Sequence, residues 1–352
     1  MANIVTAVGP SNRALINHWG KDPTTNRPDS ASLSVTLDMK DLEGRLLRTK
    51  TSVAFSDTFS KDRLYIDGKL VDLTTVESME RFRPVDGLRE MAGVRDRVLV
   101  VSQNSFPSAA GIASSASGVA TLVMATSRAL DLNLDAKELS KIARMGSGSA
   151  SRSLFGGVVL WERGVNPDGS DSFARQVFTS EYWPELVDVI VVVSSERKPI
   201  SSTEGMMLSR NTSPLYKARL EYVPGAIDGV LSDFAARNFD SLAARLMKES
   251  DNLHEVMRTT VPSIVYLTPK SHQIIDGVVA LNEAAGRNIA AYTVGAGPNV
   301  HIITEQYNLA VVHAMLDKLD VNGAGFSVRI GGSGPIVVDD SHLIDPDTLN
   351  PR

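Results

Sequence analysis

Small side chains crowd one stretch of the chain in an order that suits phosphate binding. Residues 108–117 hold eight Ala and Ser residues and one Gly, between a predicted strand and an apolar segment with helical character. A helix N-terminus presents unpaired N–H groups and a partial positive charge, and small side chains let phosphate oxygens approach it. The alternative is a small-residue helix packed closely on a sheet, and this stretch alone does not separate the two. The candidate phosphate-binding residues are Ser108, Ala109, Ala110, Gly111, Ala113, Ser114, Ser115 and Gly118.

The composition narrows the chemistry further. The chain has 352 residues, no cysteine and a formal net charge of −5. Without cysteine there is no disulfide, thiolate metal site or cysteine nucleophile. The slightly acidic charge argues against binding to nucleic acid or to a membrane surface. No apolar run approaches the roughly 18 residues of a membrane span, and the N-terminus lacks the pattern of a secretory signal. We therefore expect a cytoplasmic protein.

Strands and helices alternate irregularly around these residues. Periodicity predicts strands over 32–39, 97–106, 156–163, 186–195, 288–297 and 325–332, the fourth buried on both faces. Asp67-Gly68 predicts a hairpin turn. Helices are expected from 111 onward, over 135–145 with Asp135 as N-cap, and over 213–257 as two helices broken near Asn238. The methionines, including the pair Met206-Met207, are assigned to the core. The mixture favours an α+β fold over a doubly wound sheet.

Several motifs, in a fixed order over most of the chain, are more specific than any one of them. Together they resemble the GHMP kinase superfamily and, within it, the diphosphomevalonate decarboxylases. The first motif is similar to the family's opening Asn-Ile-Ala-x-x-Lys-Tyr-Trp-Gly-Lys. The matching stretches are SNRALINHWGK, SASLSVTL, PSAAGIASSASG, GSGSASRSLFGG, KPISSTEGM and AGPN.

The resemblance implies a fold and an assembly. It implies an N-terminal domain like ribosomal protein S5 and a C-terminal ferredoxin-like α/β sandwich, with a cleft between them. We place the N-terminal phosphate-loop domain at 1–180, the C-terminal domain at 181–340 and a tail at 341–352. A homodimer is expected by analogy only. ATP and Mg²⁺ are the expected cofactors, with no tightly bound metal.

The resemblance also implies a reaction and roles for named residues. In the family, ATP phosphorylates the tertiary 3-hydroxyl of 5-diphosphomevalonate; the new phosphate and carbon dioxide then leave to give isopentenyl diphosphate. Arg152 matches the catalytic Arg that holds the substrate carboxylate, a task suited to a planar guanidinium. Alone, these residues would be solvated, structural or capping side chains. The expected substrate-binding residues are Asn12, Asn17, His18, Lys21, Ser147, Arg152, Ser202 and Thr203.

Two positions depart from the family pattern. Gly295 stands where the family has an Asp beside the 3-hydroxyl, and Asn17 stands where it has a Lys near that Asp. Losing both leaves no stranded charge, so the paired change favours a re-tuned site. A positioned general base is worth about 10²- to 10⁴-fold, and phosphoryl transfer depends mainly on positioning, so activity can survive. Four readings stay open: an ATP-dependent decarboxylase, an ATP-independent one acting on mevalonate 3,5-bisphosphate, a mevalonate 3-kinase-like enzyme, and a catalytically impaired binding homologue. The first of these is the headline prediction.

Overall fold

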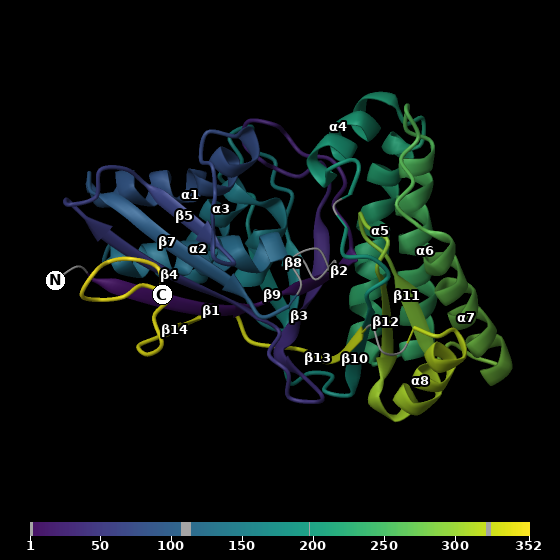
Figure 1. Cartoon of the computed structure of the whole chain (residues 1–352). Coiled ribbons are helices and arrows are strands. Elements are labelled where there is room, and N and C mark those ends of the chain that lie inside the picture. The colour runs from purple at the N-terminus through teal and green to yellow at the C-terminus, as the bar shows by residue number, and fades with distance from the viewer. Residues whose placement is uncertain (1–2, 107–113, 197, 322–324) are drawn as a thin grey trace.

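The structure is a computed structural model that describes residues 3–106, 114–196, 198–321 and 325–352. Its α+β architecture has an N-terminal layered unit on one side and a helix-covered sheet on the other (Figure 1). No helix among the described residues is long and apolar enough to cross a membrane.

The first sheet forms the N-terminal layer and is covered by two helices, with a third helix packed against them. Val53, Val98 and Val100 from its middle strands pack against Val85 of α1 and Leu122 of α2. The strands are β1 (Ile4–Pro10), β4 (Arg48–Ser56), β5 (Arg63–Ile66), β6 (Lys69–Leu70), β7 (Arg97–Asn104) and β14 (Ile336–Val338), in the order β14-β1-β4-β7-β5-β6. The helices are α1 (Val76–Ala92), α2 (Ser114–Ala129) and α3 (Ala136–Gly146).

The second sheet runs through both halves of the molecule, because β13 pairs with β10 on one side and with β3 on the other. Its order is β11-β12-β10-β13-β3-β8-β9, with β2 also paired to β3. Its strands are β2 (Asn12–Ile16), β3 (Ser32–Asp41), β8 (Val158–Trp161), β9 (Ala174–Phe178), β10 (Leu186–Val191), β11 (Ala290–Thr293), β12 (Val300–Glu305) and β13 (Gly325–Ile330).

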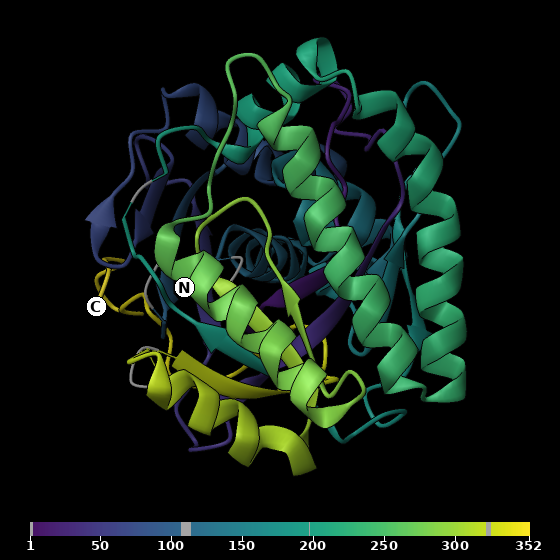
Figure 2. The ribbon, with the colours of Figure 1, turned by 90° about the vertical axis from the view of Figure 1, so that its right-hand side faces the viewer.

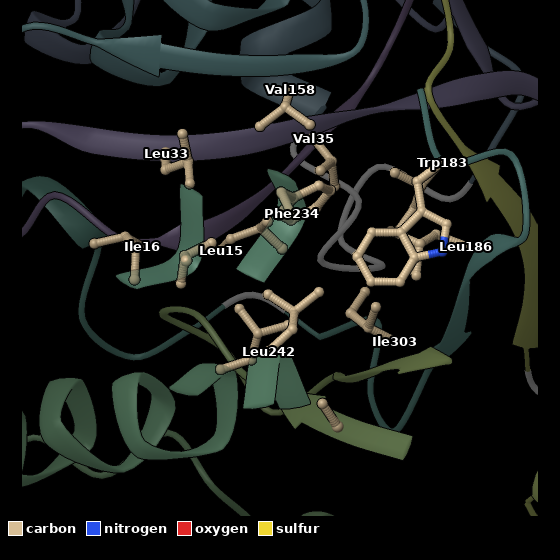
Figure 3. Close-up of a cluster of buried hydrophobic side chains, with 14 of the residues drawn as sticks. Leu15, Ile16, Leu33, Val35, Val158, Trp183, Leu186, Phe234, Leu242 and Ile303 are labelled. Carbon is tan, nitrogen blue, oxygen red and sulfur yellow. The ribbon is translucent and has the colours of Figure 1, made fainter. Parts of the chain in front are cut away.

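Helices cover both faces of the C-terminal part of this sheet (Figure 2). Phe234 and Leu242, from the α5–α6 pair, pack on Leu15, Leu33 and the neighbouring strands to form the core in Figure 3. The helices are α4 (Ser202–Thr212), α5 (Tyr216–Ala236), α6 (Phe239–Arg258), α7 (Pro269–Ala285) and α8 (Leu309–Lys318), with short 3-10 helices η1 (Gly148–Leu154) and η2 (Gln306–Asn308).

Local sequence signals account for several of these elements. Asp135 and Glu138 form the reciprocal capping box that starts α3. Asp67 and Gly68 both have positive φ in the hairpin turn between β5 and β6. Asn238 caps α6 where the long helical segment breaks. Residues of β10 alternate between the two core clusters, as expected for a strand buried on both faces.

The core assignment of the methionines is wrong at three positions, because Met79 is 57% exposed, Met91 56% and Met207 58%. Met206, the neighbour of Met207, is buried. The two residues are neighbours on α4, and adjacent positions of a helix point about 100° apart, so only one can face the core.

Candidate active site

Arg152 lies buried on η1, the short helix that follows α3. Only 2% of the residue is exposed, and its Nη1 donates to the hydroxyl of Ser32 at 2.8 Å. Ser32 in turn donates to the carbonyl of Ile16 at 2.8 Å, and the guanidinium carbon lies 5.8 Å from the centre of the Trp161 ring. Among the described residues Arg152 has no acidic partner, and its Nε is buried without a hydrogen bond. Burial lowers the pKa of Arg152 to about 9, which still leaves it charged at neutral pH.

Asn12 joins β2 to the helix that carries Arg152. Its Nδ2 donates to the hydroxyl of Ser153 at 2.5 Å and to the carbonyl of Ser149 at 3.2 Å. Ser147 ends α3 and precedes η1, and its hydroxyl lies 3.2 Å from that of Ser149. The serine-rich segment thus turns sharply under β2, and small side chains permit the close approach.

His18 lies over the same tryptophan as Arg152. The His18 and Trp161 ring centres are 4.9 Å apart, and the rings meet edge to face at 74°. Burial, followed by the positive charges of Arg152, Lys21 and Arg219, holds the pKa of His18 well below its ordinary value. His18 is therefore a neutral side chain beside the guanidinium.

Lys21 has an acidic neighbour, which its sequence motif did not indicate. Its Nζ lies 2.7 Å from Glu80 of α1, and only 12% of the Lys21 side chain is exposed. A phosphate bound by Lys21 would share the ammonium group with Glu80 or displace that carboxylate.

Lys198 connects two motifs and was missed by the sequence reasoning. Its Nζ donates to Ser202 at 3.0 Å and to the carbonyl of Ala296 at 2.6 Å. Ser202 begins α4, whereas its neighbour Thr203 is exposed and has no hydrogen bond from its side chain among the described residues. Burial lowers the pKa of Lys198. The only signal in the sequence was its place at the start of the KPISSTEGM motif.

The two altered family positions lie side by side. A Cβ added to Gly295 would lie 3.8 Å from the Asn17 Oδ1 and 3.6 Å from the Nη1 of Arg13. Two side chains of the α5–α6 pair fix the Asn17 backbone. Its N–H donates to Glu249 at 3.0 Å, and its carbonyl accepts from Arg219 at 2.7 Å. Arg219 and Glu249 form a fully buried ion pair at 2.6 Å. Residues far apart in the chain thus meet at one point between the two halves of the molecule.

Most of the small-residue stretch cannot be placed. Ser108, Ala109, Ala110, Gly111 and Ala113 lie outside the described residues. The predicted helix does follow, since α2 begins at Ser114 and contains Ser115 and Gly118 in its first turns. A Cβ at Gly118 would meet no atom of the described residues within 4 Å, so those residues leave the backbone open there. Within the described ranges there is no group of three or more His, Asp or Glu side chains able to hold a metal ion.

The site therefore has two parts with separate supports. Arg152, His18 and Asn12 gather around Trp161 and η1, whereas Asn17, Gly295 and Arg13 gather where β2 meets the end of β11. Two hollows lined by described residues, one beside Trp183 and one beside Arg329, share no residue with either part. Within the described part of the chain, the arrangement offers several hydrogen-bond donors and a buried cation without an acid partner, which suits an anionic ligand.

The fold and site define a two-domain protein of the GHMP-kinase fold. Residues 9–174 match the family model of the diphosphomevalonate decarboxylase-like N-terminal domain, and residues 188–325 match that of the mevalonate 5-diphosphate decarboxylase C-terminal domain. The chain belongs to the diphosphomevalonate decarboxylase family.

Relatives and solved structures agree with this membership. The chain is 40% identical over 324 residues to the diphosphomevalonate decarboxylase of Debaryomyces hansenii, covering 89% of this chain and 82% of the relative. It is 41% identical over 313 residues to the diphosphomevalonate decarboxylase of Danio rerio, covering 86% of this chain and 76% of the relative. The mevalonate diphosphate decarboxylase of Staphylococcus aureus superposes with a TM-score of 0.87 at 30% identity, covering 96% and 99%. The structure of MDDEF in complex with MVAPP, AMPPCP and magnesium superposes with a TM-score of 0.86 at 31% identity. The match covers 97% of this chain and 100% of that structure.

Proposed function

We propose that this protein is a decarboxylase of a phosphorylated mevalonate in the mevalonate pathway, with Arg152 holding the substrate carboxylate. The observation that carries the proposal is the buried guanidinium of Arg152, which has no acid partner among the residues that the structure describes. A buried charge is costly unless it is paired, so its retention is best explained by an anionic ligand. Family membership supplies the reaction: the relatives named above are diphosphomevalonate decarboxylases.

The reaction removes two groups from neighbouring carbons. The bond between the tertiary carbon and its phosphate oxygen breaks. The bond between the neighbouring methylene carbon and the carboxylate carbon breaks as well. The electron pair of the second bond forms the new double bond, so inorganic phosphate and carbon dioxide leave together. Arg152 orients the carboxylate through its planar donors, and Ser32 and the Trp161 ring fix the guanidinium.

The remaining side chains orient the other end of the substrate. Lys21, Ser147 and Ser202 are positioned by motif to hold the 5-phosphate, and Lys198 adds an ammonium beside Ser202. Binding energy from this remote group holds the reacting end in place. The start of α2, with open backbone at Gly118, suits the phosphates of ATP. Magnesium would arrive with the nucleotide and supply charge neutralisation for phosphoryl transfer.

The phosphate on the tertiary carbon either comes from ATP or is already present on the substrate. Without a carboxylate at Gly295, no acid stands at that position to accept the hydroxyl proton. This favours, as a second candidate, an ATP-independent decarboxylase that takes mevalonate 3,5-bisphosphate and performs only the elimination. The 3-kinase-like and impaired-homologue alternatives make different products and are separated by the same experiment. We further propose a cytoplasmic homodimer, by family analogy.

One panel of incubations tests the proposal. The protein is mixed with mevalonate, its 5-phosphate, 5-diphosphate and 3,5-bisphosphate, each with and without Mg-ATP, and carbon dioxide and ADP are measured. Carbon dioxide with ATP supports the headline function, and carbon dioxide from the bisphosphate without ATP supports the second candidate. ADP without carbon dioxide indicates a kinase. Binding without any product indicates an impaired homologue and contradicts the proposal.

A further inference from the structure

We propose that Arg13 is a substrate-contacting cation that binds a phosphate carried by the tertiary carbon. The inference rests on the proposed function and names the substrate class of the same site. Arg13 lies on β2, only 7% exposed, and reaches across to β11, where its Nη2 donates to the hydroxyl of Thr293 at 3.0 Å. Its Nη1 lies 3.6 Å from the point where a Gly295 side chain would begin. The guanidinium thus occupies the place beside the reacting centre.

Donors without acceptors converge at this point. The Nε of Arg13 and the Nδ2 of Asn17 are both buried and have no hydrogen-bond partner among the described residues. The Nη1 of Arg13 has none in that part of the chain either. A buried donor without an acceptor destabilises the folded protein, and more so when the donor is charged. Acceptors brought by a ligand would relieve this cost, and a phosphate offers several.

Arg13 is charged and forms no salt bridge with any acid among the described residues. Asp188 on β10 attracts the guanidinium electrostatically, but its carboxylate contacts the His301 ring at 2.7 Å. His254 of α6, also nearby, has a pKa lowered to about 4 mainly by burial, so it adds no charge at neutral pH. Burial lowers the pKa of Arg13 to about 10, with Asp188 opposing the shift. Arg13 is therefore a cation at the working pH.

The residues beside Gly295 select for negative charge on the ligand. In the opening motif, Arg13 stands where the family pattern has Ile, Asn17 where it has Lys, and Gly295 where a later motif has Asp. The neutral Lys–Asp pair is replaced by one cation, and the carboxylate that would repel a phosphate is absent. Such a site favours a tertiary phosphate over a tertiary hydroxyl by electrostatics.

The test compares two ligands that differ only at the tertiary oxygen. Affinities for mevalonate 5-phosphate and mevalonate 3,5-bisphosphate are measured by calorimetry, in an Arg152→Met background that blocks loss of carbon dioxide. With Arg13 in place, we expect the bisphosphate to bind at least 10-fold more tightly. Arg13→Ile should remove most of that preference, roughly 10-fold or more, while affinity for the 5-phosphate changes less than 3-fold. Arg13→Lys should retain part of the preference.

A second pair of variants leaves Arg13 untouched. The φ of Gly295 lies outside the left-handed region, and no atom of the described residues lies within 3.4 Å of an added Cβ, so a Cβ is accommodated there. Gly295→Asp places a carboxylate beside Arg13 and should lower bisphosphate affinity at least 10-fold. Gly295→Asn has the same shape without the charge, and the loss should be under 3-fold. This contrast holds even if Arg13→Ile fails to fold.

The outcomes separate the inference from the proposed function. If carbon dioxide is released but the preference for the bisphosphate is absent, or is unchanged by Arg13→Ile and by Gly295→Asp, the role of Arg13 is overturned and the decarboxylase stands. If neither ligand binds and no substrate yields carbon dioxide, both fall together. Equal losses for both ligands would mark Arg13 as structural and overturn the inference.

Discussion

At the scale of single residues, we predict that Arg152 decides whether carbon dioxide is released. Arg152→Met should lower the rate at least about 10³-fold, because it removes a charge-assisted clamp and the orientation that the clamp provides. Since the guanidinium is buried and no described residue supplies an acid partner, the variant should be no less stable and should unfold at the same or a higher temperature. Product assays check the expected loss of rate, and thermal unfolding checks the expected stability. Near-normal release, or a collapsed fold, would contradict this assignment.

The altered pair of residues 17 and 295 offers a second prediction at this scale. Asn17→Lys together with Gly295→Asp should raise ATP-dependent decarboxylation of diphosphomevalonate by more than the two single changes combined. A Lys introduced alone at position 17 would face the positive charge of Arg13, whereas an Asp at position 295 would lie beside both cations and offset one of the two positive charges. The coupling between the changes at positions 17 and 295 should grow in an Arg13→Ile background, because Arg13 then no longer competes for the introduced carboxylate. A double-mutant cycle of kcat/KM measures it, and additive effects would argue against a coupled pair.

At the scale of elements, the α5–α6 pair supports the site through a buried ion pair. Glu249→Gln leaves the charge of Arg219 uncompensated and should cost about 3–5 kcal/mol of unfolding free energy. It should also weaken substrate binding, because the Asn17 backbone rests on both side chains. Arg219→Met with Glu249→Leu, which removes both charges, should be less destabilised than the single change. Urea unfolding of the unaltered protein, the single variant and the double variant checks this prediction. An unchanged free energy of unfolding in Glu249→Gln would contradict it.

Much of the fold could be predicted from local patterns, but the meeting of distant elements could not. Asp135, Asn238 and the Asp67-Gly68 turn act through neighbours a few residues away, so their motifs are sufficient. The position of Arg13 beside Gly295 depends on where the tertiary structure places β2 relative to β11, which no local signal encodes. For the same reason the ion pair of Lys21 with Glu80 went unseen. The substrate roles assigned to Asn12, Ser147, Ser202 and Thr203 stay predictions, as do the domain boundaries.

At the scale of the whole molecule, one sheet links the two halves and the last residues return to the first sheet. Strand β13 pairs with both β3 and β10, and β14 then pairs with β1 (Figure 1). Beyond β14, Ile344 is fully buried against Ala54, Leu99 and Val101. Because β-sheet pairing is continuous across the molecule, we expect the halves to unfold together and not as separate domains.

Ile344→Ala tests this cooperativity from the far end of the chain. The cavity should cost about 2–4 kcal/mol, and the whole urea transition should move to lower denaturant. Tryptophan fluorescence, which includes the buried Trp183 of the C-terminal core, should shift by the same amount as far-ultraviolet circular dichroism. Asp347→Ala, at an exposed neighbouring position, is the matched control and should change stability by less than about 0.5 kcal/mol. Two separated transitions, with only one displaced by Ile344→Ala, would mean that each half folds alone and that the continuous sheet does not couple them.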